Sequence, residues 1–214
     1  MRRYLFLLLL LPLLPPRAVA QTQARMLMGV SGYTLFGTSE IEFEPVFRLA
    51  GGGGLTHWVA PAFGIRGELR YTIQGGSFNG TVDGSVGGEP EPIPVEATFD
   101  LTYLEIPVML VAGFDVLRAS RVEFAFGPAI AIKVDTRSSF SAESGPILSQ
   151  GVSARDRING LTASVDWIFP VRAEKLLIGL RGWRSLTPAG LEETVPGTEG
   201  VKSTGITLIG GLVF

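Results

Sequence analysis

Cysteine is absent from this chain of 214 residues, and histidine occurs only once, at His57. Without cysteine the protein can form no disulfide and offers no thiolate as a metal ligand or nucleophile. One histidine is too few for most transition-metal sites, and we place His57 on an outward face near the end of a strand. We therefore expect no catalytic, cofactor-binding or metal-binding residues, and no enzymatic activity.

The sequence also has no long apolar run after residue 20. It begins with Arg2 and Arg3, continues with an apolar stretch over residues 4–14, and reaches the small-x-small pattern Ala18-Val19-Ala20. This order is typical of a cleaved secretory signal peptide, and the apolar stretch is too short and too rich in proline for a membrane anchor. We predict that residues 1–20 are the signal peptide and that residues 21–214 form a single mature domain.

The chain also has no excess of basic over acidic residues. The chain has 18 Lys and Arg against 20 Asp and Glu, and cleavage after residue 20 would remove three arginines, which leaves a net charge of −5. Nucleic-acid binding requires a basic face, so we expect no nucleic-acid partner.

What the mature sequence does contain is alternation of apolar and polar residues with period two. In residues 63–74, for example, Ile65 and Leu69 alternate with Arg66, Glu68 and Arg70. Such segments have about the length of a tilted transmembrane strand, roughly 9–11 residues. Eight of them can be counted: 25–36, 46–57, 63–74, 98–111, 122–135, 161–169, 176–184 and 205–214. We predict an all-β fold, an eight-stranded antiparallel up-and-down transmembrane β-barrel.

The connections between these segments alternate between long and short. Residues 37–45, 79–96, 136–157 and 185–200 are expected to be long loops, and residues 58–62, 112–121 and 170–175 short turns. This asymmetry is typical of outer-membrane barrels. We predict that the protein lies in the bacterial outer membrane, with the long loops outside the cell and both termini in the periplasm. Three long loops, 37–45, 79–96 and 185–200, hold ten acidic and no basic residues, which favours a solvated face or, as a sharper reading, divalent-cation bridging or a basic partner.

Alternation alone does not decide which face points to lipid, and a soluble barrel with apolar residues inside stays an alternative. Small residues on the polar faces favour the membrane barrel, because the interior of eight strands is only just wide enough for side chains. Aromatic residues near segment ends are expected to form interfacial girdles: Trp58, Phe63, Trp167, Phe169 and Trp183.

The charges on the predicted inward faces are the main candidate site. We predict a lumen network of nearly balanced charge, because an unpaired buried charge is very costly. A plug of ion pairs is favoured over a selectivity filter or proton path. Its members are Arg48, Arg66, Glu68, Arg70, Glu105, Glu123, Lys133, Asp166 and Arg181. We also expect the terminal aromatic residue, Phe214, to serve as the assembly signal for the barrel-insertion machinery.

Three motifs resemble the PorT-like outer-membrane β-barrel family. They are residues 69–76 (LRYTIQGG), 103–108 (YLEIPV) and 126–128 (FGP), and residues 181–186 (RGWRSL) depart from the family pattern. The resemblance covers the mature chain and implies an outer-membrane barrel without an assigned activity. Its secretion-related name does not transfer a role to this chain, because one fold hosts many functions.

These features favour a non-enzymatic barrel with a structural role or a loop-mediated interaction role. The expected partners are outer-membrane lipid, the insertion machinery and a protein outside the cell or in the periplasm. A small pore or transport protein is the alternative, and an outer-membrane lipid-modifying enzyme is a weaker one.

Overall fold

A computed structural model of the protein describes most of the chain after residue 20. The described residues are 21–37, 42–86, 89–116, 119–142, 145–147, 153–172, 174–191 and 200–214. The predicted signal peptide lies outside these residues, as do residues 192–199 of the last long connection.

The described chain is built of β-strands. Their bounds are β1 Gln21–Phe36, β2 Val46–Ala60, β3 Phe63–Val86, β4 Glu89–Asp115, β5 Arg121–Ala142, β6 Gly145–Ile147, β7 Arg157–Val171, β8 Glu174–Ser185 and β9 Lys202–Val213. Within the described part of the chain, no helix is long and apolar enough to cross a membrane.

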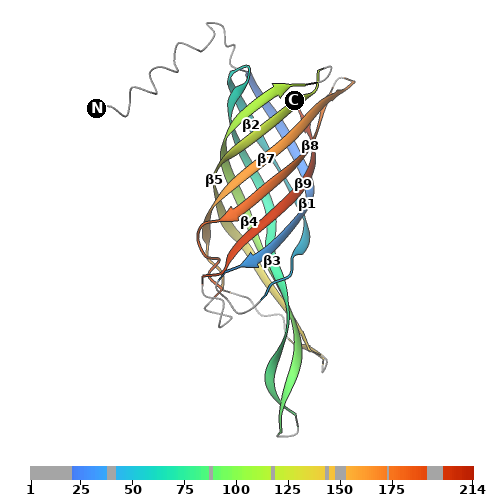
Figure 1. Ribbon diagram of the computed structural model, residues 1–214, viewed down its shortest axis with the longest axis vertical. Helices are drawn as coiled ribbons and strands as arrows, with labels where there is room; N and C mark the ends of the chain where they lie inside the picture. The colour runs from blue at the N-terminus through green and yellow to red at the C-terminus, as the bar shows by residue number, and fades with distance from the viewer. Residues whose placement is uncertain are drawn as a thin grey trace, which may run out of the picture.

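Eight of the strands close into an antiparallel ring (Figure 1). Neighbours in sequence pair around the ring, β5 pairs with β7, and β1 pairs with β9 from Arg25↔Val213 to Phe36↔Lys202. The three-residue β6 only extends the edge of β5. Both the start of β1 and the C-terminus lie at the end of the barrel that carries the short turns. The up-and-down barrel expected from the alternation is thus the observed fold.

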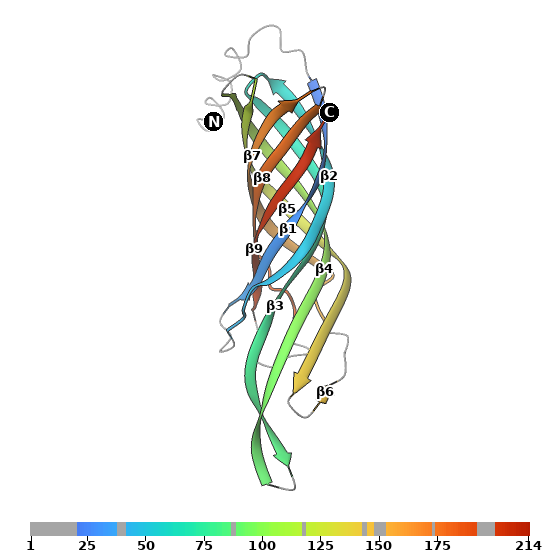
Figure 2. The same cartoon turned by 90° about the vertical axis from the view of Figure 1, so that its right-hand side faces the viewer.

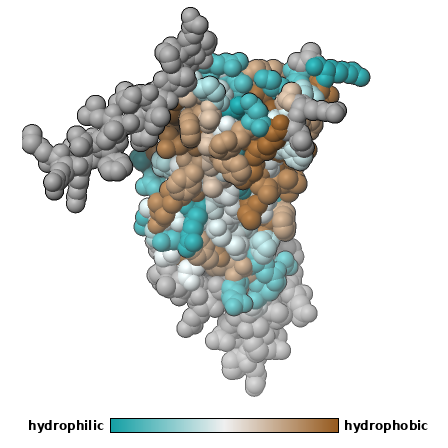
Figure 3. Space-filling view, turned by 45° about the horizontal axis from the view of Figure 1, so that its top comes forward, coloured by the Kyte–Doolittle hydropathy of each residue, from teal (hydrophilic) through white to brown (hydrophobic). Residues whose placement is uncertain are grey.

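Each barrel strand buries one face and exposes the other. In β3, Arg66 is 0% exposed whereas Leu69, three residues later, is 49% exposed. On the face shown in Figure 3, apolar residues gather on the barrel wall, while hydrophilic residues collect around the end turned toward the viewer. Large apolar side chains therefore face outward and polar ones face inward, as in a membrane barrel and opposite to a soluble one.

The segment 79–96 is not the long loop that its composition suggests. Strands β3 and β4 continue through it and pair without interruption as far as Val86↔Glu89. Figures 1 and 2 show this hairpin extending well beyond the rest of the barrel. The prolines of this segment led to the prediction of a loop. Proline is nevertheless tolerated in a strand at positions where the hydrogen-bond ladder does not need its missing N–H.

Two of the aromatic residues assigned to the interfacial girdles face inward instead. Trp58 is only 6% exposed and Trp183 only 4% exposed. Their positions in the alternation require this, because Trp58 follows the outward His57, and Trp183 is two residues from the inward Arg181. Phe63 and Trp167 do lie on the exposed face.

Candidate functional site: the charged lumen

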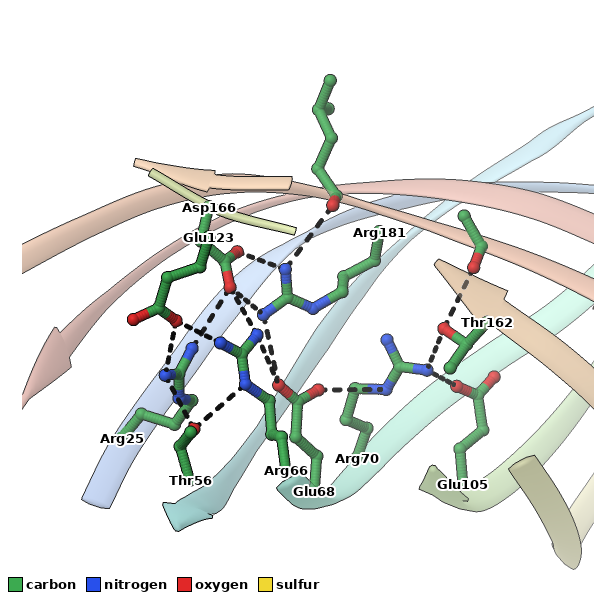
Figure 4. Close-up of polar contacts among 12 residues, drawn as sticks. Arg25, Thr56, Arg66, Glu68, Arg70, Glu105, Glu123, Thr162, Asp166 and Arg181 are labelled. Atoms are coloured by element: carbon green, nitrogen blue, oxygen red, sulfur yellow. Dashed lines mark hydrogen bonds and ion pairs between the residues drawn. The ribbon is translucent and has the colours of Figure 1, made fainter. Parts of the chain in front are cut away.

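Eight charged side chains fill the middle of the barrel, and we call them the central network (Figure 4). Four are arginines and four are carboxylates, so their formal charges sum to zero. The members are Arg25, Arg66, Arg70, Arg181, Glu68, Glu105, Glu123 and Asp166. Alternation brings each of them inside, and the closed ring brings together residues from six different strands.

Asp166 on β7 is the hub of one half of the network. Its Oδ2 accepts from Nη1 of Arg25 at 3.1 Å and from Nη1 of Arg66 at 2.6 Å. Arg181 on the neighbouring β8 donates to both of its oxygens, at 3.1 Å from Nη2 to Oδ2. Three guanidinium groups therefore surround one buried carboxylate, and charge balance must come from other acids nearby.

Glu123 and Glu68 supply that balance. Glu123 Oε2 accepts from Nη2 of Arg25 at 3.0 Å and also from Arg66. Glu68 Oε1 accepts from Nη2 of Arg181 at 3.2 Å and lies 3.9 Å from Nη1 of Arg66. In addition, the hydroxyl of Thr56 accepts from Arg25 and Arg66, at 2.9 and 3.1 Å. Such charge-assisted bonds compensate part of the cost of removing the ions from water.

Glu105 on β4 is the hub of the second half. Its Oε2 lies 2.8 Å from Nη2 of Arg70. Its Oε1 accepts from the Tyr33 hydroxyl at 3.0 Å, from the Thr72 hydroxyl at 2.9 Å and from the Gln74 amide at 2.8 Å. One arginine and three neutral donors thus hold this carboxylate inside the barrel.

Little space remains around the central network. A cavity beside Arg70 and Arg181 measures about 10 Å³, which is about the smallest volume that can hold one water molecule. Toward the end with the long connections, buried apolar residues such as Leu101, Ile158 and Leu191 pack together and fill the barrel. At the opposite end a vestibule of about 480 Å³ is open, where the Arg121 guanidinium lies 4.2 Å from the centroid of the Trp58 ring.

Comparison with known proteins bears on this architecture. Residues 20–189 match the model of a family described as an outer membrane protein β-barrel domain. The chain belongs to this family. Membership places the barrel in the bacterial outer membrane, whereas the narrower PorT-like resemblance stays a prediction.

A comparison with solved structures found several matches of low sequence identity. OprG from Pseudomonas aeruginosa is 11% identical, with 91% of this chain and 96% of OprG covered and a TM-score of 0.46. Ail, the attachment invasion locus protein of Yersinia pestis, is 11% identical over 91% of this chain and 99% of Ail, with a TM-score of 0.44. Neisserial surface protein A is 11% identical over 88% and 96%, with a TM-score of 0.45. These values are too low to support a functional argument, and no curated protein sequence matches the chain.

Two residues assigned to the lumen network lie apart from it in this outer-membrane barrel. Arg48 pairs with Asp100 at 2.9 Å, and the Arg48 side chain is 34% exposed. Lys133 is 26% exposed and pairs at 2.7 Å with Asp156, which lies just before β7. Both have the inward parity. Arg48 is the third residue of β2, and Lys133 lies one residue beyond the last pair of β5 with β7, Ile132↔Arg157, so both are close to where the interior meets solvent. The other seven assigned residues lie in the central network.

Arg25 belongs to the central network but was not assigned to it. The sequence did indicate that Arg25 faces inward, because it lies an even number of positions from Ser31 and Tyr33, which also face inward. A strand that begins at Gln21 places Arg25 well inside the barrel, whereas a strand predicted to start at Arg25 leaves it at the rim.

His57 lies on the outward face, where its Nδ1 is 3.0 Å from the Thr22 hydroxyl. Among the described residues, no carboxylate bonds to its imidazole, and no group of three His, Cys, Asp or Glu side chains is arranged to hold a metal ion.

Proposed function

We propose that this outer-membrane barrel is a non-enzymatic, non-conducting anchor that presents its long connections to a partner. The observation that carries the proposal is the central network, in which four arginines and four carboxylates bond to one another across the lumen. An ion that enters would have to break these pairs in a space without room for its hydration shell.

The proposed orientation follows from the two unlike ends of the barrel. The short turns and both ends of the mature chain would face the periplasm, and the long connections would face outside. The cleaved signal peptide at residues 1–20 and the PorT-like resemblance are part of the same proposal.

The alternatives have weaker support. A pore would need a continuous path, but buried apolar side chains such as Leu101 and Leu191 fill the end opposite the vestibule. A lipid-modifying enzyme would need a base oriented by a third group beside its nucleophile. His57 has only Thr22 as a described hydrogen-bond partner.

Planar lipid bilayers test the closed lumen. We expect no reproducible single-channel current from the wild-type protein, from Arg70→Gln or from Glu105→Gln, because the rest of the network and the apolar cluster remain in place. The matched control is Arg48→Gln, which changes a charge outside the network. A reproducible current whose ion selectivity follows the charge at position 70 or 105 would replace the closed anchor with a pore.

A further inference from the structure

The hairpin of β3 and β4 is much longer than a membrane requires. The two strands have 24 and 27 residues, whereas a transmembrane strand needs about 9–11. Their register is constant from Arg70↔Glu105 to Val86↔Glu89, with no bulge. Beyond the barrel, the hairpin therefore has two edges whose backbone groups can be assigned from parity alone.

Part of the β3 edge carries backbone donors that are not paired with any described strand. The backbone N–H and C=O of Ser77 both bond to Glu44, on the side away from β4. Because these groups change sides at each residue, Thr81, Asp83 and Ser85 also direct their N–H and C=O away from β4. Apart from β4, no described strand pairs with β3 along these three residues.

The edge of β4 is blocked by proline. The register partners of Thr81, Asp83 and Ser85 are Pro94, Pro92 and Pro90. These positions direct their backbone toward the edge opposite β3, on which β5 pairs only as far as Val95↔Ala142. Proline has no N–H to donate, so each of these positions on the β4 edge lacks a donor, while the β3–β4 ladder loses none. Among the described strands, the β4 edge of the hairpin therefore disfavours an added strand, whereas the β3 edge is unpaired and open.

The charge of the hairpin indicates what the open edge accepts. Residues 79–96 contain Asp83, Glu89, Glu91 and Glu96 but no lysine or arginine. A second copy of the hairpin would bring like charges together, which disfavours pairing between copies. A strand that carries lysine or arginine would instead be attracted.

We infer that the open edge of β3 at Thr81, Asp83 and Ser85 binds an extended, basic segment of a partner protein as an added strand. Main-chain hydrogen bonds would provide affinity, and the acidic hairpin would select for positive charge. This inference rests on the proposed anchoring role, because it assigns the partner site to one hairpin and one edge.

A synthetic octapeptide of alternating lysine and valine is a suitable probe, with the full-length protein in lipid nanodiscs. We expect wild-type protein to bind it in a salt-dependent way, and an alternating glutamate–valine peptide not to bind. The variant Thr81→Pro/Asp83→Pro removes two donors from the open edge and should bind about tenfold more weakly. The matched control Thr81→Val/Asp83→Asn loses the same hydroxyl and charge but keeps both N–H groups, and should bind better than the proline variant.

A second measurement leaves the protein unchanged. A fully N-methylated lysine–valine peptide keeps the charge but has no backbone donors, and we expect it to lose binding. Equal binding of the two peptides, or of the proline variant and its control, would show that charge alone attracts the probe and would overturn strand addition. So would a complete lack of binding to wild-type protein, or dimerisation through the hairpin in place of peptide binding.

The blocked edge gives a converse test. Pro92→Thr restores a donor to the β4 edge, and we expect this variant to bind additional lysine–valine peptide. Unchanged peptide stoichiometry would contradict the assignment of the blocked edge to proline. None of these measurements depends on conductance, so a conducting barrel that binds the peptide at β3 would contradict only the closed lumen.

Discussion

Arg66 and Asp166 lie 100 residues apart in the sequence, yet Nη1 of the arginine donates to Oδ2 of the aspartate at 2.6 Å in the middle of the barrel. Arg66 comes from β3 and Asp166 from β7. Both side chains are fully buried, so each compensates part of the charge of the other.

Asp166→Asn should destabilise the folded barrel strongly. The change removes the negative charge that three arginines share, and it leaves buried positive charge without compensation, at a cost on the order of 3–5 kcal/mol. Urea unfolding in lipid, followed by the heat-dependent gel mobility of the barrel, would measure the change. The control is Asp100→Asn, which breaks the partly exposed pair with Arg48 and should cost no more than about 1 kcal/mol. Equal effects of the two changes would contradict a buried network.

Arg70 and Glu105 should show coupled energetics in a double-mutant cycle. Either Arg70→Met or Glu105→Gln alone leaves a buried charge without its partner at 2.8 Å. The double variant leaves no orphan charge, so its loss of stability should be smaller than the sum of the single losses. Strict additivity would show that the two groups are independent.

Leu180→Arg should test which face of the barrel contacts lipid. Leu180 is exposed, lies midway along β8 and pairs with Leu208 and Val165. An arginine near the centre of a bilayer costs about 2–4 kcal/mol, and one near its edge about 0–1 kcal/mol. Val171→Arg, at the last residue of β7, is therefore the matched control. A smaller cost at position 180 than at 171 would contradict the membrane placement.

Phe214→Ala should lower the yield of inserted protein. Phe214 is exposed on the barrel wall, and its N–H bonds to the carbonyl of Ala24 at 2.9 Å, next to the seam between β1 and β9. If the terminal aromatic is the assembly signal, its loss should matter much more than Phe47→Ala, which removes an even more exposed aromatic from β2. Quantification of heat-modifiable protein in isolated outer membranes would compare them, and equal yields would argue against a terminal signal.

Period-two alternation was enough to predict the number of barrel strands and the side on which most residues lie. The inward positions of Glu68, Glu123 and Arg181 followed from their neighbours alone. The prediction was wrong where we relied on residue type and not on the position of a residue in the alternation. Trp58 was assigned to a girdle because it is aromatic, and residues 79–96 were assigned to a loop because they are rich in proline and glycine.

The sequence by itself determined which side chains enter the lumen, because alternation in a strand is a local property that neighbouring residues reveal. Only the tertiary structure decided which of them meet. Contacts across the lumen, such as Arg25 with Asp166 over 141 residues, depend on the register of every strand pair around the ring. The unequal edges of the β3–β4 hairpin have the same origin, since a proline blocks an edge only when the register directs its nitrogen there.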